Sequence, residues 1–179
     1  MAITPPSERI GWKEPVRKVE IIWVIIAFLW GVAMFFTMIW WHGFGQQNMS
    51  NEAYRVQPFQ FAEKVDAMVA AHTVRQEGAF PVVKPPPGSD VYMMGRVYMW
   101  WPMLELEKGQ TYRLHLSSID LQHGFSLQPL NINIQVHPGY ESVMTITPTS
   151  SGEFGIVCNE YCGLGHHTMT GRIYVVERT

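Results

Sequence analysis

The residues best suited to bind a metal lie in one short stretch near the C-terminus. The stretch from Cys158 to Met169 reads CNEYCGLGHHTM and holds both cysteines of the 179-residue chain. Cys162, His166 and Met169 follow the first cysteine at spacings of three and four residues. Thiolate, imidazole and thioether groups on one loop, with a second histidine elsewhere, are typical of copper sites that transfer electrons. Zinc would accept two cysteines and two histidines, but it has no use for the thioether of Met169.

Two cysteines separated by NEY also allow other functions. They could close a strained disulfide in an oxidising compartment, or serve a copper chaperone or thiol oxidoreductase. A mononuclear blue-copper site needs one cysteine, whereas two thiolates can bridge a pair of copper ions, each with one terminal histidine and one weak axial ligand. His123, in SIDLQHGFSL at the start of a predicted strand, is the best candidate for the second histidine. His137 lies in a tight turn and His115 alternates within a strand, so both are expected to be structural.

An apolar segment near the N-terminus predicts how this site is anchored. The residues from Ile21 to Trp41 include no charged side chain, and as a helix they would extend roughly 30 Å, enough to cross a bilayer. The segment is longer than the apolar core of a signal peptide and is followed by WWHGFGQ, a poor cleavage site. We therefore expect one uncleaved transmembrane helix at 20–42.

The charges beside this helix predict its orientation. After the span the next basic residue is Arg55, and the positive-inside rule therefore places the N-terminal segment 1–19 in the cytoplasm and the rest outside the cell membrane. The basic residues before the span are Arg9, Lys13, Arg17 and Lys18. The net charge of −2 argues against nucleic acid as a partner.

The rest of the chain predicts a β domain preceded by a connector. Residues 43–88 are expected to form a helical connector, PFQFAEKVDAMVAAHTV, and a stiff proline-rich linker, VKPPPGSD. Residues 89–179 change to short apolar or alternating segments separated by turns such as EKG, HPG and SSG, which predicts an antiparallel sandwich or barrel. The expected strands are 91–99, 111–117, 131–136, 141–147, 153–157 and 171–176.

Three motifs resemble one protein family. The run VCNEYCGLGHHTMTGRIYV resembles the dinuclear copper (CuA) loop of cytochrome c oxidase subunit II. SIDLQHGFSL resembles the family's S-x-D-x-x-H-x-F segment, and NINIQVHPG resembles its N-x-x-x-x-V-x-P-G strand and turn. The resemblance implies one N-terminal transmembrane helix followed by an all-β, cupredoxin-like Greek-key barrel. It also implies an electron-accepting subunit of a terminal haem–copper oxidase.

The same resemblance implies a CuA centre of two copper ions with two bridging thiolates, two terminal imidazoles, one axial thioether and one axial backbone carbonyl. These ligands correspond, in that order, to Cys158 and Cys162, His123 and His166, Met169, and Glu160. The carboxylate of Glu160 could also bind a magnesium ion at the interface with the catalytic subunit. His167 has the wrong spacing for a ligand and is expected to face solvent or that interface.

The implied partners are a haem-bearing catalytic subunit I in the membrane, which reduces oxygen, and a cytochrome c-type donor. The cluster YMWWP contains Trp100 and Trp101, which would receive the electron from the donor if exposed, or else fill the barrel core. Asp120 would orient the His123 loop through hydrogen bonds, unless it forms an ordinary Asx turn. A nitric oxide reductase could use the same kind of CuA subunit, because that distinction lies in the partner.

A single helix, VRQEG at 74–78 and the wording CGLGH resemble the B-type, ba-like branch of prokaryotic oxidases. In that branch a subunit II glutamate a few residues before a tryptophan forms the mouth of the proton channel. Glu20 precedes Trp23 in this way. Alternatively, Glu20 merely reaches the membrane interface or pairs with a neighbouring basic residue. The helix expected at 58–73 is not a feature associated with that branch, and its role is open.

Overall fold

A computed structural model describes residues 14–45, 52–130 and 132–178. Arg9, Lys13 and Asn131, on which some expectations rest, lie outside the described residues. The chain divides into two compact units, 1–47 and 48–179, and each is described by itself.

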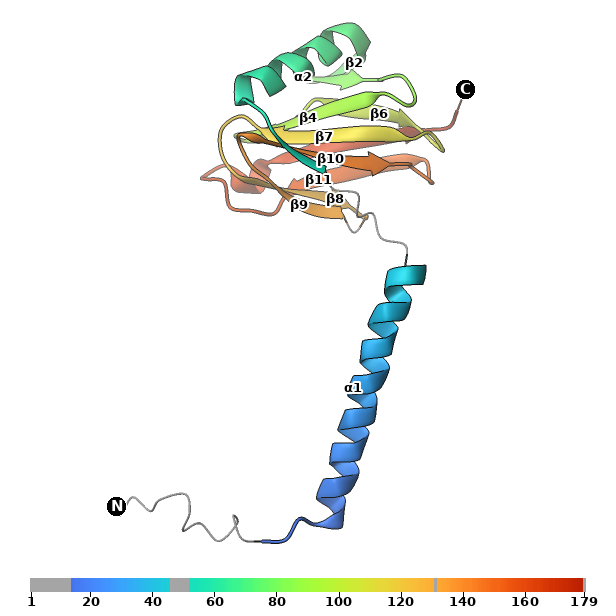
Figure 1. Cartoon of the computed structure of the whole chain (residues 1–179). Coiled ribbons are helices and arrows are strands. Elements are labelled where there is room, and N and C mark those ends of the chain that lie inside the picture. Colours follow the sequence, from blue (N-terminus) through green and yellow to red (C-terminus); the bar gives the residue numbers. More distant parts are fainter. Residues whose placement is uncertain (1–13, 46–51, 131, 179) are drawn as a thin grey trace, which may run out of the picture. The chain divides into compact units, whose positions relative to one another are not determined.

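The first unit contains the helix α1, Lys18–Phe44 (Figure 1). Among the described residues it is the one helix long and apolar enough to cross a membrane. It exceeds the expected span of 20–42 by two residues at each end. None of its side chains is buried within the chain, so its apolar surface is left for lipid or for another protein.

The start of α1 has a side-chain cap. The carboxylate of Glu20, in the first turn, accepts the backbone N–H of Arg17 at 2.9 Å. This hydrogen bond satisfies one donor that the start of a helix leaves without an intrahelical partner.

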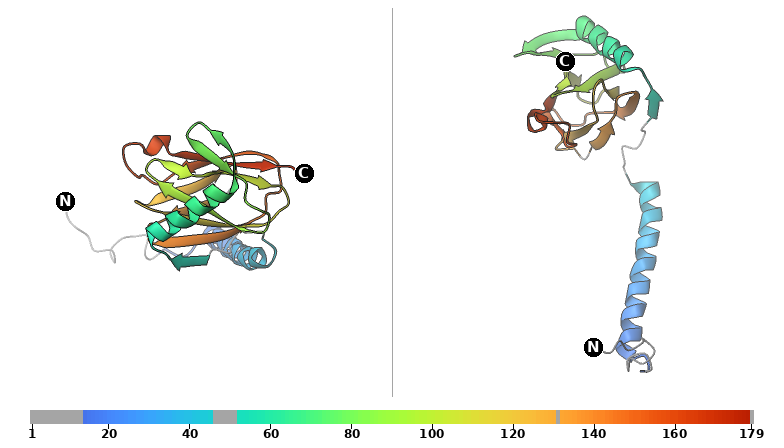
Figure 2. Two further views of the ribbon diagram at one scale, coloured as in Figure 1. Left: turned by 90° about the horizontal axis from the view of Figure 1, so that it is seen from above. Right: turned by 90° about the vertical axis from the view of Figure 1, so that its left-hand side faces the viewer.

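The second unit is a β domain whose described residues include an α-helix, α2 (Pro58–His72), on its outside (Figure 2). The five-stranded sheet has the order β1-β10-β7-β4-β5, and the seven-stranded sheet has the order β2-β3-β6-β12-β11-β8-β9. The strands of the first are β1 Glu52–Arg55, β10 Tyr140–Ile146, β7 Tyr112–Ser118, β4 Asp90–Arg96 and β5 Met99–Trp101. Those of the second are β2 Thr73–Glu77, β3 Phe80–Val83, β6 Met103–Glu107, β12 Thr170–Val176, β11 Gly152–Cys158, β8 His123–Gln128 and β9 Ile132–Val136.

The core lies between the two sheets. Alternate side chains of a strand point to opposite faces, and Leu114 and Leu116 of β7 thereby enter the same fully buried cluster as Leu104, Leu106 and Phe125 from the other sheet. This core supports the strand ends that carry the candidate metal ligands.

The expectation of a purely antiparallel domain is wrong. β4 pairs in parallel with β7, and β6 pairs in parallel with β3 and with β12. Parallel neighbours are joined by long connections, and local sequence periodicity does not show which distant strands will pair.

Within the expected connector 43–88, residues 52–88 are built into the β domain. The expected helix is present as α2, whose buried residues Phe61, Val65 and Met68 form one face. However, β1 pairs with β10, and β3 lies between β2 and β6 and pairs with both. The structure therefore shows no domain boundary at 88/89. These strands have four or five residues each, too few for a clear period-two pattern.

Candidate metal centre

The pairing of β11 with β12 brings together the two ends of the loop 159–168. Val157 lies opposite Thr170, and the backbone N–H of Cys158 donates to the carbonyl oxygen of Met169 at 3.1 Å. The first cysteine and the methionine therefore lie side by side although the loop separates them in sequence. Within the loop, a short 3-10 helix at His166–Thr168 presents His166.

β8 brings His123 to the same place. It pairs with β11 so that Phe125 lies opposite Cys158, and His123 is the first residue of the strand. The imidazole is completely buried. A Cβ atom on Gly95 of β4 would lie 2.9 Å from this ring, so the absence of a side chain at residue 95 makes room for the histidine.

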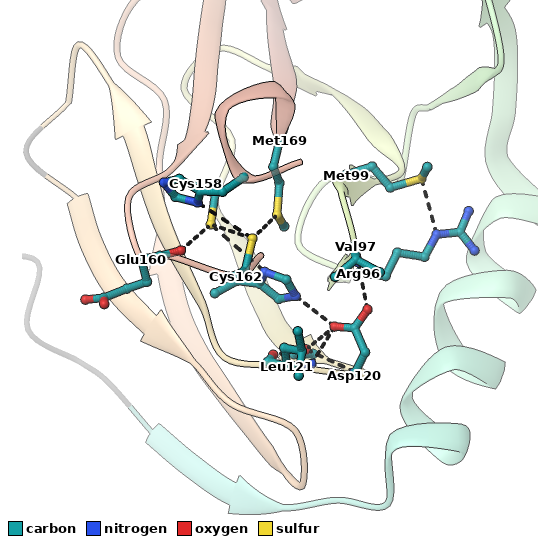
Figure 3. Close-up of polar contacts among 12 residues, drawn as sticks. Arg96, Val97, Met99, Asp120, Leu121, Cys158, Glu160, Cys162 and Met169 are labelled. Carbon is teal, nitrogen blue, oxygen red and sulfur yellow. Dashed lines mark hydrogen bonds and ion pairs between the residues drawn. The ribbon is translucent and has the colours of Figure 1, made fainter. Parts of the chain in front are cut away.

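All six expected ligand groups come together in the structure. Each nitrogen, oxygen or thioether donor lies within 4.0 Å of one cysteine sulfur, and the sulfur atoms point toward one another (Figure 3). The two cysteine sulfurs are 3.9 Å apart. Cys158 Sγ lies 4.0 Å from His123 Nδ1 and 3.2 Å from the carbonyl oxygen of Glu160. Cys162 Sγ lies 3.6 Å from His166 Nδ1 and 3.7 Å from Met169 Sδ.

The two cysteines are free thiols whose spacing fits a metal site. With a metal–sulfur bond of about 2.3 Å, the length known for zinc, one ion can contact both sulfurs. The ligand atoms of His123, Cys158 and Cys162 lie within 4.8 Å of one another.

The cysteine side chains are shielded from water. Burial, reinforced by the adjacent Cys158, raises the pKa of the Cys162 thiol to about 11. Without a metal this thiol is protonated at neutral pH, and metal binding must release its proton. A buried thiol with a raised pKa is unsuited to thiol exchange, which needs an accessible thiolate.

Asp120 makes the hydrogen bond expected with the His123 segment. Its Oδ1 accepts the Nε2–H of His123 at 2.8 Å, and its Oδ2 accepts the backbone N–H of Val97 at 2.7 Å (Figure 3). Burial acts to raise the pKa of Asp120, but these hydrogen bonds, that of Val97 first, hold the pKa below its ordinary value. With the proton on Nε2, the lone pair of His123 Nδ1 faces the cysteine sulfurs.

The two tryptophans of β5 lie on opposite faces. Trp100 is completely buried, with its ring edge-to-face against the imidazole of His123 at a centroid distance of 6.0 Å. Of the two roles expected for Trp100, its burial agrees with filling the core, because the alternation along β5 turns its side chain inward. Trp101 is half-buried, and the guanidinium of Arg96 lies 4.9 Å from its ring centroid. Its contact with a donor stays a prediction.

Two further histidines, His115 and His167, were not expected to be ligands. His115 is buried on the opposite face of the five-stranded sheet and contacts the carboxylates of Glu141 and Asp90, in agreement with a structural role. His167 is exposed, as expected.

The side chain of Glu160 points away from the sulfurs while its carbonyl faces them (Figure 3). The carboxylate accepts the side-chain N–H of Gln135 from β9 at 2.9 Å. Gln135, Val97 and Gly95 were not expected from the sequence, because nothing in their local pattern indicates a neighbour in another strand.

The chain is similar to known oxidase subunits in sequence and in fold. It is 39% identical over 112 residues to cytochrome c oxidase subunit 2 from Thermus thermophilus, and the match covers 59% of this chain and 83% of that protein. The chain belongs to the cytochrome c oxidase subunit II family. It is also 37% identical over 76 residues to a probable cytochrome c oxidase subunit 2 from Streptomyces coelicolor, covering 42% of this chain and 24% of that protein. No protein-family model matches the chain.

A solved structure shows the same fold. A chain of a heme-copper terminal oxidase dimer, determined by cryo-electron microscopy, matches with a TM-score of 0.59 at 19% identity, covering 89% of this chain and 100% of that one. The expected fold class, one N-terminal apolar helix and a cupredoxin-like β domain, is confirmed.

Membership in the subunit II family makes this chain a subunit of an oxidoreductase, with a role in electron uptake. Its single candidate membrane helix among the described residues agrees with a membrane-anchored subunit. The relatives do not decide whether it belongs to the B-type branch, which stays a prediction.

Proposed function

We propose that this subunit holds a dinuclear CuA centre, accepts electrons one at a time from a cytochrome c-type donor and passes them to haem in the catalytic subunit I. The convergence of two buried thiols, each beside one imidazole nitrogen and one weaker donor, is the observation that carries this proposal. Soft sulfur and imidazole donors suit copper. The relatives named cytochrome c oxidase subunit 2 support it further.

The proposed ligands are those implied by the motifs. Cys158 and Cys162, with the imidazoles of His123 and His166, would hold the copper ions, which would supply a one-electron redox centre. The chain supplies a rigid site, because Cys158 and Met169 are held at paired strand ends and His123 is fixed by Asp120. Burial of the sulfurs also excludes water from them.

The further partners follow from this proposal. Helix α1 would span the cell membrane with its N-terminus in the cytoplasm, beside subunit I, and the β domain would face outward. Trp101 would contact the donor, Glu20 would admit protons, and the Glu160 carboxylate would bind magnesium at the interface between subunits. None of these roles requires nucleic acid.

The alternative of a copper chaperone or thiol oxidoreductase is less well supported. Both thiols are buried, and the pKa of Cys162 is raised rather than lowered. A nitric oxide reductase subunit would use the same centre, so assays of the assembled complex with oxygen and with nitric oxide distinguish the two oxidoreductases.

The central test uses the full chain, purified in detergent and reconstituted with copper. We expect two copper ions per chain and a mixed-valence EPR signal with the unpaired electron shared over both. We also expect reduction of the centre upon rapid mixing with a reduced cytochrome c. A single copper ion, or a cysteine pair that cycles between dithiol and disulfide, would instead support the chaperone or thiol oxidoreductase.

A further inference from the structure

The turn that joins β4 to β5, Arg96–Met99, touches both segments that carry the expected histidine ligands. On one side, the backbone N–H of Val97 donates to Asp120, which accepts the Nε2–H of His123 (Figure 3). On the other side, the ring of Tyr98 lies against Gly163 and Gly165 of the metal loop. One short turn therefore contacts two segments that are distant from each other in sequence.

The contact between Tyr98 and Gly165 leaves no space for a side chain. Gly165 has φ −89° and ψ 9°, a conformation open to residues other than glycine. A Cβ atom there would nevertheless overlap the tyrosine ring, with Cε2 only 2.6 Å away. The ring, and not the backbone conformation, thus requires glycine at this position. Tyr98 is itself half-buried and packs against the main core, which fixes its ring.

Gly165 also directly precedes the 3-10 helix of the loop, as its N-cap residue. Its carbonyl oxygen accepts the backbone N–H of Thr168 at 2.9 Å and the hydroxyl of the same residue at 2.7 Å. His166 follows directly, with Nδ1 at 3.6 Å from the Cys162 sulfur. A displacement of Gly165 would therefore move the imidazole relative to the sulfur.

We propose that Tyr98 is a positioning residue that holds His166 in place through Gly165, and that the Arg96–Met99 turn thereby fixes both histidine-bearing segments to one strand pair. The consequence for copper rests on the proposed function, whereas the contact itself exists without a metal. Tyr98 touches neither copper nor donor in this proposal, and it acts through the shape of the loop.

The test is a double-mutant cycle that changes side-chain size at positions 98 and 165 in the copper-loaded full chain. Gly165→Ala should release copper to an added chelator about tenfold faster than the unsubstituted chain, because overpacking against the ring displaces His166. Tyr98→Ala should also release copper faster, because the loop loses its support. In the double variant the new methyl group has room, so it should release copper no faster than Tyr98→Ala alone. Tyr98→Phe keeps the ring and should match the unsubstituted chain.

Matched controls separate positioning from general loss of stability. At Gly155 of β11 a Cβ atom would meet nothing within 4 Å, so Gly155→Ala should leave copper release unchanged. Tyr92→Ala removes another half-buried tyrosine, next to Phe61 of α2, and should lower the thermal stability without changing the EPR hyperfine pattern. If Tyr98→Ala does not fold, Tyr98→Leu replaces it in the same cycle.

Two results would overturn the proposal: copper release from Gly165→Ala at the normal rate, or a double variant whose effect equals the product of the single effects. The unsubstituted chain, Gly165→Ala, Tyr98→Ala and the double variant are also compared by thermal unfolding without copper. Non-additive unfolding temperatures would support the contact even if the unsubstituted chain failed to form a two-copper centre, an outcome that would contradict only the proposed function. Additive unfolding temperatures would contradict the contact itself.

Discussion

At the scale of single residues, the two cysteine sulfurs have equivalent surroundings. Cys158 has the His123 imidazole and a carbonyl oxygen beside it, and Cys162 has the His166 imidazole and the Met169 thioether. Each sulfur thus lies between the other sulfur, one strong nitrogen donor and one weak donor. The proposed pair of copper ions would use all of these donors.

The proposed bridging role of the thiols predicts that neither can be lost. Cys158→Ser or Cys162→Ser should reduce the two-copper centre to a mononuclear or empty site, because a serine hydroxyl is a hard and poorly ionised ligand. Copper analysis and EPR spectroscopy of the purified chain measure this. A mixed-valence signal that survives in either variant would defeat the ligand assignment.

Met169 is expected to tune the centre rather than to hold it. Met169→Leu conserves most of the buried volume but removes the sulfur at 3.7 Å from Cys162. The variant should retain two copper ions while its visible spectrum and reduction potential change. Complete loss of copper in metal analysis would show that Met169 has another role.

Asp120 is expected to act through the orientation of His123. Asp120→Ala removes the acceptor of the Nε2–H, and loss of such a partner typically weakens metal binding about 10- to 100-fold. Competition with a chelator gives the copper affinity. Asp66→Ala, which changes an exposed aspartate on α2, is the control and should bind copper normally. Equal affinities for both variants would contradict an orienting role.

At the scale of elements, strand pairing accounts for most of the site. β11 and β12 close the metal loop, β8 delivers His123 to the end of β11, and β4 provides the glycine against which the imidazole rests. Helix α2 packs outside the barrel against Met94 of β4, through Phe61 and Val65. The helix therefore supports β4, the strand that leads into the Arg96–Met99 turn.

Helix α1 carries the element-scale prediction, because the Glu20 carboxylate could both cap the helix and pass protons. Glu20→Gln separates these roles, since an amide oxygen can still accept the N–H of Arg17 but does not ionise. In the assembled oxidase we expect this variant to reduce oxygen several-fold more slowly while electron uptake at the copper site stays normal. Unchanged turnover in a fully assembled variant would leave Glu20 a capping residue only.

At the scale of the whole molecule, the β domain has a core to which α1 contributes no buried side chain. A chain that begins at residue 46 should therefore fold in water and bind copper like the full chain in detergent. Circular dichroism, thermal unfolding and EPR spectroscopy of this fragment provide the comparison. An unfolded or aggregated fragment would mean that the domain depends on the apolar helix.

The sequence by itself determined those features that depend on local chemistry. The charge-free run from Ile21 to Trp41 predicted α1. The residue types and spacing from Cys158 to Met169 indicated a metal-binding loop, and the structure brings its sulfur and imidazole groups together. The three- and four-residue spacing of Phe61, Val65 and Met68 likewise predicted the buried face of α2. In each case, residue type and short-range periodicity contain the relevant information.

Only the tertiary structure decided features that depend on contacts between distant strands. Such contacts determine the parallel strand pairs and the burial of Trp100. They also determine that the strands β1, β2 and β3 join the two sheets. The same holds for the contact of Tyr98 with Gly165. Each residue on its own is an ordinary turn residue, but the Tyr98 ring leaves no space for a side chain at position 165. The physical reason is that side-chain volume and hydrogen-bond partners are shared across the fold, and no local segment of the sequence contains both members of such a pair.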